Sequence, residues 1–246
     1  MKQIIKDFHR DRDSVISLMD FDKTILEFPI RQLESLLPHF QEHQLNKAIA
    51  KTQRSLDILR GIRSNESTKL AYKTIYNQCV VLLVSYFAAT LEDIFKHCIV
   101  VALKHDMLPA LRKEEISLQI GDFRRVADDP LGSAADFIVE HHGISFQDMG
   151  SVRRNCLKFL HYEPQRTEDV NDIICGQAAR HIVVHSGGVI NNKFLRQISD
   201  AIPRKLKPNM PQSGEIEFAP EEIVHLAASM ERYLEQLSRG LAQYDK

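Results

Sequence analysis

Residues 179–188, which read ARHIVVHSGG, contain the side chains best suited to chemistry on a phosphate group. Arg180 keeps its charge at any physiological pH, and its guanidinium forks onto phosphate oxygens. His185 follows five residues later, and histidine is the side chain most often used to accept or release a proton. Gly187 and Gly188 come directly after and indicate the end of a helix. On an ideal helix the two side chains lie about 140° apart around the axis, so they do not share one face, and a loosened last turn before Gly187 would help them converge.

The spacing of Arg180 and His185 resembles the R-x4-6-H signature of HEPN domains, a superfamily of small helical bundles. The residue after the arginine in that signature is usually Asn, Asp or His, and here it is His181. The glycine pair after the histidine also resembles the family. Many HEPN members are metal-independent endoribonucleases, and this chain resembles the RiboL-PSP and MAE-type HEPN domains.

The resemblance extends beyond the motif to about residues 66–205. Residues 83–94 resemble the first core HEPN helix, and residues 145–160 resemble the internal helix that precedes the motif helix. The resemblance implies an antiparallel helical bundle that forms a homodimer. Two motif helices would then meet and build one composite cleft with two arginines and two histidines.

Cleavage of RNA without a metal needs a base for the 2′-OH, an acid for the leaving 5′-oxygen and a cation for the charge on phosphorus. We assign proton transfer to His185, which lies near a helix C-terminus where the dipole favours its protonated form. Arg180 holds the phosphate, and His181 or Ser186 positions the reacting groups. The expected products carry a 2′,3′-cyclic phosphate and a 5′-OH. No cofactor is expected.

The family context implies a toxin or phage-defence effector that acts on the cell's own RNA or on invading RNA. Such an enzyme needs restraint, so an antitoxin or regulatory protein is an expected partner. Some HEPN toxins carry a tyrosine two residues after the histidine, which a partner nucleotidyltransferase modifies. Gly187 occupies that position here, so we do not expect a nucleotidyltransferase antitoxin.

Other charged residues are candidates for supporting roles. Glu92 is a candidate acidic adjunct to the site, although it can equally meet a basic side chain or solvent. A local excess of basic residues in 191–210 suggests contacts with the RNA backbone, and a solvated basic face is the alternative. The RNA-binding candidates are Arg153, Arg154, Lys158, Lys193, Arg204, Lys205 and Lys207.

Two simpler interpretations of the histidines remain open. His185 can cap a helix at a dimer interface without any catalytic role. His181 and His185 are four residues apart and can bind zinc from one helix face. The glutamate of an HExxH motif is absent, however, and the spacing offers no third ligand. We therefore expect no metal site.

The composition predicts helices as the scaffold for this motif. The 246 residues include only 10 Gly and 9 Pro, too few for the many turns of an all-β fold. The strongest apolar periodicity runs from Thr68 to about His105 and is apolar on nearly every side, as in the central helix of a bundle. Before it, we expect a short helix and a loop up to residue 29, then helical segments interrupted at Pro38.

The second half predicts shorter helices with recognisable ends. Ser145 can cap the helix of residues 145–160, and Thr167 can cap the motif helix. A further helix reaches about Ala201, and a closing helix spans about 220–243. Residues 215–218 form the one short stretch with strand character. The fold class is thus all-α, with an N-terminal helical extension (1–65) and a HEPN-like bundle (66–246).

The net charge and the cysteines limit the partners and the cellular compartment that the sequence allows. The formal net charge is −1, which excludes a histone-like polycation but not a local RNA-binding patch. The four cysteines have no CxxC spacing, so a disulfide scaffold or zinc ribbon is not expected, and they should pack as small apolar residues. The N-terminus lacks the apolar core of a signal peptide. We expect a cytoplasmic protein without membrane contact.

The leading functional hypothesis is an endoribonuclease. The rival is a non-catalytic HEPN module that dimerises and binds RNA, nucleotide or protein. Catalysis requires Arg180 and His185 to be exposed in one cleft, whereas a scaffold tolerates their burial. A third class, a helical adaptor without a nucleic-acid role, predicts that the basic residues of 191–210 are scattered away from the cleft.

Overall fold

The computed structural model describes residues 1–19, 21–64, 66–108, 115, 119 and 121–245. The described part consists of helices joined by loops, which confirms the all-α prediction. Its extended segments meet at one antiparallel bridge, between Val189 and Glu215. The strand character predicted for residues 215–218 is therefore limited to this single pairing.

The helices follow one another along the chain with short connections in most places. They are α1 (Lys2–Met19), α2 (Phe21–Glu42), α3 (Asn46–Ser64), α4 (Glu66–Lys104), α5 (Asp122–Asp128), α6 (Pro130–His141), α7 (Met149–Leu160), α8 (Glu168–Ser186), α9 (Asn192–Ile198) and α10 (Pro220–Gly240). A 3₁₀ turn, Ala242–Tyr244, follows α10.

Helix α4 is the central element of the bundle, as its periodicity predicts. It packs against α1, α6, α8 and α10, and Leu83, Phe87 and Ile99 are completely buried. Residues 72–104 are long and apolar enough to cross a membrane by length and composition, and half of their most apolar window is buried in the structure. A core helix meets the same criteria, and the packing on several sides accounts for the apolar composition of α4.

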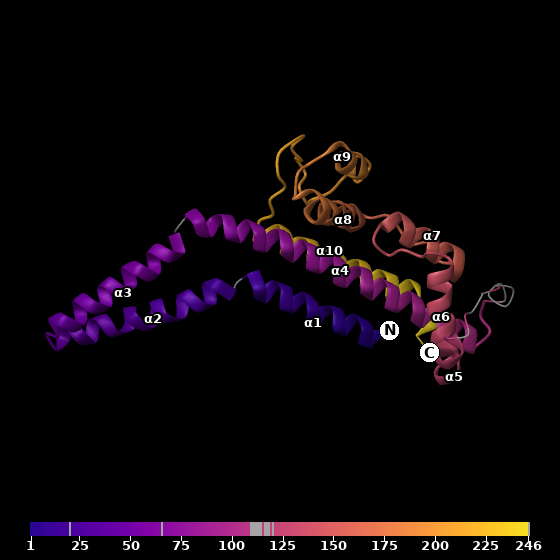
Figure 1. Ribbon diagram of the computed structural model, residues 1–246, viewed down its shortest axis with the longest axis horizontal. Helices are drawn as coiled ribbons and strands as arrows, with labels where there is room; N and C mark the ends of the chain where they lie inside the picture. The colour runs from indigo at the N-terminus through magenta and orange to yellow at the C-terminus, as the bar shows by residue number, and fades with distance from the viewer. Residues whose placement is uncertain (20, 65, 109–114, 116–118, 120, 246) are drawn as a thin grey trace.

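Helices α1 and α10 lie along α4 and form the long axis of the molecule with it (Figure 1). The Phe8, Phe87 and Tyr233 rings link the three helices edge to face, with centroids 6.2 and 5.8 Å apart. The two chain ends lie close together, because the Met1 amino group is 3.3 Å from the Asp245 carboxylate. Helix α1 thus belongs to the main core.

Helices α2 and α3 form a hairpin that projects from the bundle (Figure 1). The expected loop before residue 30 and the interruption at Pro38 are both wrong, because α2 is continuous through Pro29 and Pro38. Each proline removes one backbone hydrogen bond. The carbonyl left free by exposed Pro38 belongs to exposed Glu34, so water can satisfy it. Packing against α3, with an Arg60–Glu34 ion pair of 2.6 Å, supports the helix.

The local signals at the ends of α8 are confirmed. The Thr167 hydroxyl accepts from the Val170 N–H at the start of the helix. At the end, Gly187 adopts a left-handed conformation with φ +59°, which glycine tolerates best. Helix α7, by contrast, begins at Met149 with Asp148 as its cap, not at Ser145. Helix α9 also ends at Ile198, three residues earlier than predicted.

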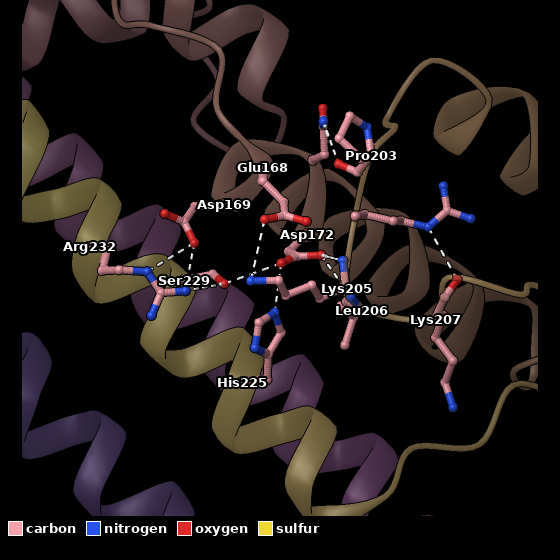
Figure 2. A network of polar contacts seen from close by, with 12 residues as sticks. Glu168, Asp169, Asp172, Pro203, Lys205, Leu206, Lys207, His225, Ser229 and Arg232 are labelled. Carbon is pink, nitrogen blue, oxygen red and sulfur yellow. Dashed lines mark hydrogen bonds and ion pairs between the residues drawn. The ribbon is translucent and has the colours of Figure 1, made fainter.

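A buried carboxylate holds α8 to the loop after α9 and to α10 (Figure 2). Asp172 is 1% exposed. It accepts hydrogen bonds from the backbone N–H groups of Lys205 and Leu206, at 2.8 and 2.7 Å. Its other oxygen lies 2.7 Å from His225 Nε2 on α10. These contacts fix the position of α8, and therefore of the motif that it carries.

Candidate functional site

The motif residues occupy the last two turns of α8. Arg180 and His181 are half-buried, whereas His185 is exposed. The His181 and His185 rings lie side by side, with centroids 4.8 Å apart, as expected for residues four apart on a helix. Helix α8 therefore presents two adjacent imidazoles next to an arginine.

Lys193, the second residue of α9, reaches the same cluster. Its Nζ lies 3.2 Å from Nε2 of His181. Because an ammonium group can only donate, Nε2 must accept, and the ring proton of neutral His181 lies on Nδ1. Partial burial and the positive charges of Lys193, His185 and Arg180 lower the pKa of His181. At neutral pH His181 is thus an uncharged imidazole held by a lysine.

Arg180 lines a cavity of about 800 Å³ between α4, α8 and the segment that leads into α7. Within the described part of the chain, its guanidinium has no hydrogen-bond or ion-pair partner. His181 lines the same cavity. A guanidinium group without a partner at the edge of a cavity is suited to bind two oxygens of an anion such as a phosphate.

Gln177 lies one turn before Arg180 and extends into the same cavity wall. It is 7% exposed. Its Oε1 accepts from the Met149 N–H at 3.0 Å, so it satisfies a free donor at the start of α7. Among the described residues, its Nε2 has no hydrogen-bond partner. Gln177 cannot be identified from the sequence, because a glutamine in a helix carries no signal of burial.

His185 stands apart from this cavity, at the exposed end of α8. Its helix remains regular to Ser186, and the N–H groups of Gly187 and Gly188 both bond to the carbonyl of Ile182. Ser186 is half-buried. Arg180 therefore faces the cavity, while His185 faces solvent next to the ring of His181.

Glu92 also lines the cavity, from α4. Its carboxylate is 2.6 Å from Lys96 Nζ, which also contacts Asp136 at 2.9 Å. Glu92, the candidate acidic residue, thus lines the same cavity as Arg180, but its carboxylate is already paired with a lysine of its own helix.

The basic candidates do not form one surface. Lys193 alone among them contacts a motif residue in the described structure. Arg153 pairs with Glu163, Arg154 donates to Ser151, and the Lys158 ammonium lies over the Phe159 ring.

The remaining three basic candidates lie in the loop after α9, and each has a partner within the protein. The Arg204 guanidinium donates to the carbonyls of Ile198, Ala201 and Lys207. The Lys205 ammonium pairs with Glu168 at 3.4 Å, and that of Lys207 pairs with Glu222 at 2.6 Å. These side chains stabilise the loop shown in Figure 2.

Comparison with known proteins identifies no relative. No family model, curated protein or solved structure matches this chain.

The cysteines are structural. All four are free and buried, as predicted. Burial raises the pKa of Cys79 to about 11, and raises the pKa of Cys98, Cys156 and Cys175 to about 12. They are thiols at neutral pH, and a thiolate is the reactive form. They pack in the core as small apolar side chains.

A group of residues that could hold a metal ion lies far from the motif, at the end of α2. The ligand atoms of His39, Glu42 and His43 are within 4.8 Å of one another, and all three residues are exposed. Their H-x-x-E-H spacing places them on one helix face, a sequence signal that the motif analysis did not use. The group lies at the tip of the projecting hairpin (Figure 1).

Proposed function

We propose that this protein is a metal-independent endoribonuclease that cleaves RNA by attack of the 2′-OH. The observation that carries the proposal is the Arg180 guanidinium, which has no hydrogen-bond or ion-pair partner among the described residues. It lies at the edge of a cavity that His181 also lines, and the His185 ring adjoins that of His181. A fixed cation next to titratable imidazoles meets the electrostatic and proton-transfer needs of the reaction.

Each residue has a separate role in this scheme. Arg180 binds the non-bridging phosphate oxygens. His185 moves the proton, because it is exposed and adjoins the ring of His181. Neutral His181, held by Lys193, orients the imidazole beside it and the phosphate.

The second half of the site comes from a second copy of the chain. One His185 can serve as base and the other as acid when two α8 ends meet. Val184 and Val189, which precede and follow His185 in the sequence, each have a side chain that is 47% exposed and can provide apolar contacts for such a pairing. The biological role that we propose is a cytoplasmic toxin or phage-defence effector, restrained by an antitoxin or regulatory protein.

The test is cleavage of labelled single-stranded and structured RNA by the purified protein in EDTA. We expect products with cyclic-phosphate ends, and a rate reduced by about 10²–10⁴ in His185→Ala, the usual share of an acid–base group. Arg180→Ala should be similarly impaired. His161→Ala, a change at the end of α7, is the matched control.

Two results would contradict the proposal. One is cleavage by both variants at the wild-type rate, which would place the activity elsewhere or in a contaminant. The other is cleavage that stops in EDTA and returns with a divalent metal.

The second candidate function is a non-catalytic module that binds RNA or nucleotide. The position of His185 outside the cavity that Arg180 lines favours it. This candidate predicts RNA binding that depends on Arg180, with no cleavage at any protein concentration and no effect of His185→Ala.

A further inference from the structure

We propose that the tip of the α2–α3 hairpin binds a divalent transition-metal ion such as Zn²⁺, with His39, Glu42 and His43 as its ligands. The site lies at the end of the projecting hairpin (Figure 1). It goes beyond the proposed ribonuclease, because none of its residues belongs to the surroundings of Arg180. It gives a ligand to a group of side chains that the proposed function does not use.

The three side chains are already close enough to share one ion. Their ligand atoms, one from each residue, lie within 4.8 Å of one another. Ligand atoms that share a tetrahedral zinc ion at about 2.0–2.2 Å are about 3.3–3.6 Å apart. Because all three side chains are exposed, they can rotate and close the remaining distance without displacing a neighbouring element.

The backbone that carries the ligands is fixed by the cap of α2. The Leu45 N–H donates to the Phe40 carbonyl at 2.9 Å, and the Gln44 N–H donates to the Gln41 carbonyl at 3.1 Å. Gln44 adopts the left-handed conformation, with φ +51°, so the two bonds form a Schellman motif. The helical turn between the two histidines is thus complete, and their spacing on one face is set before a metal binds.

The ligand atoms are available to a cation. The imidazoles of His39 and His43 meet edge to face, with centroids 4.4 Å apart. Within the described part of the chain, neither imidazole and not the Glu42 carboxylate has a hydrogen-bond or ion-pair partner. The carboxylate supplies a negative charge, and the C-terminus of α2 presents the negative end of the helix dipole. Both favour a bound cation at this position.

The donor set determines the class of metal. Two imidazole nitrogens and one carboxylate oxygen suit Zn²⁺, Co²⁺, Ni²⁺ and Cu²⁺, whereas Mg²⁺ and Ca²⁺ prefer oxygen ligands. Imidazole and carboxylate groups are common zinc ligands in proteins, so Zn²⁺ is the ion that we assign. Three protein ligands leave a coordination position open to water or to a donor from another molecule.

The motif histidines provide an internal comparison. His181 and His185 are also four residues apart, and their ring centroids are 4.8 Å apart. The Lys193 ammonium, however, already lies 3.2 Å from Nε2 of His181, and the positive charges of Lys193 and Arg180 act on the same ring. A metal cation is therefore disfavoured at the motif pair and favoured at the hairpin pair, where Glu42 is negative.

The experiment is a calorimetric titration of the full-length, metal-free protein with Zn²⁺, and the visible spectrum of bound Co²⁺ reports the coordination. We expect one Zn²⁺ per chain. His39→Ala and His43→Ala each remove a ligand and should weaken binding by at least about tenfold, the smallest loss usual even for groups that only support a ligand. Glu42→Gln keeps the shape of the side chain and should weaken binding similarly. Gln41→Ala, at an exposed neighbour on α2, is the matched control and should bind Zn²⁺ like the wild type.

Three results would overturn the proposal. One is the absence of Zn²⁺ binding, and another is binding that the substitutions at the three ligands leave unchanged. The third concerns His181→Ala: loss of Zn²⁺ binding in this variant, with retention in His43→Ala, would place the ion at the motif. Circular dichroism checks that each variant is folded, as expected for exposed positions. RNA cleavage in EDTA is a separate measurement, so the failure of either proposal is recognised independently of the other.

Discussion

At the residue scale, the chemistry of the motif depends on how neighbours set the charge of its imidazoles. His181 receives a hydrogen bond from a full positive charge, Lys193, and this charge contributes to its lowered pKa. Because the folded-state pKa of His181 lies below its unfolded value, folding favours the neutral ring. Its contribution to stability is thus present above about pH 6.5, the unfolded value, and is lost as pH falls through the lowered folded-state pKa.

Lys193→Met tests this charge coupling. The substitution removes the positive charge and keeps an unbranched side chain, so the pKa of His181 should rise towards its ordinary value. The measurement is an NMR titration of the histidine ring protons. Lys158→Met, at a lysine whose charge lies over the Phe159 ring, should leave His181 unaffected. A His181 pKa that does not move in Lys193→Met would show that the contact is absent in solution.

At the element scale, the position of α8 depends on a close approach to α10. Gly176 lies at the contact, where an added Cβ would be 2.9 Å from a methyl group of completely buried Leu226. A glycine there lets two helices approach closely, although glycine is otherwise a poor helix former. The approach brings the motif helix against both α4 and α10 and so defines one wall of the cavity.

Gly176→Val should lower the free energy of unfolding by about 1–3 kcal/mol, the usual cost of overpacking. The measurement is urea denaturation followed by circular dichroism. Gly61→Val is the matched control, because a Cβ at Gly61 of α3 meets nothing within 4 Å. The control should be nearly neutral, since valine is a slightly better helix former than glycine. Equal effects at both glycines would contradict the packing argument.

At the scale of the whole molecule, Asp172 joins segments that are distant in sequence. One buried carboxylate contacts α10 and organises the loop of residues 203–207 (Figure 2). The basic residues of that loop stabilise the fold, as their intramolecular partners indicate. The sequence analysis counted them as RNA-binding candidates because charge spacing does not reveal such partners.

Asp172→Asn should therefore destabilise the whole bundle by about 3 kcal/mol, because it removes a buried charge that two amides and His225 contact. Thermal and urea denaturation measure the change. Asp200→Asn is the control, since Asp200 is exposed, and it should have little effect. An unchanged stability in Asp172→Asn would mean that the network contributes nothing net to folding.

Local sequence signals determined much of the fold. The all-α class and the central position of α4 follow from apolar periodicity, which reports burial directly. The ends of α8 follow from Thr167 and Gly187, because caps depend on the residue itself and its nearest neighbours. The prolines of α2 led to a wrong prediction of a break. In a helix on an exposed hairpin, water can replace the backbone hydrogen bonds that a proline removes, so the helix continues.

Only the tertiary structure decided how the motif is surrounded. It brought Lys193 to His181, paired Glu92 with Lys96, and left the Nε2 group of Gln177 without a hydrogen-bond partner among the described residues. These relations join residues on different helices, or depend on which face of a helix is covered. Sequence spacing fixes neighbours along one helix, whereas packing between helices selects which polar groups are satisfied and which remain free for a ligand.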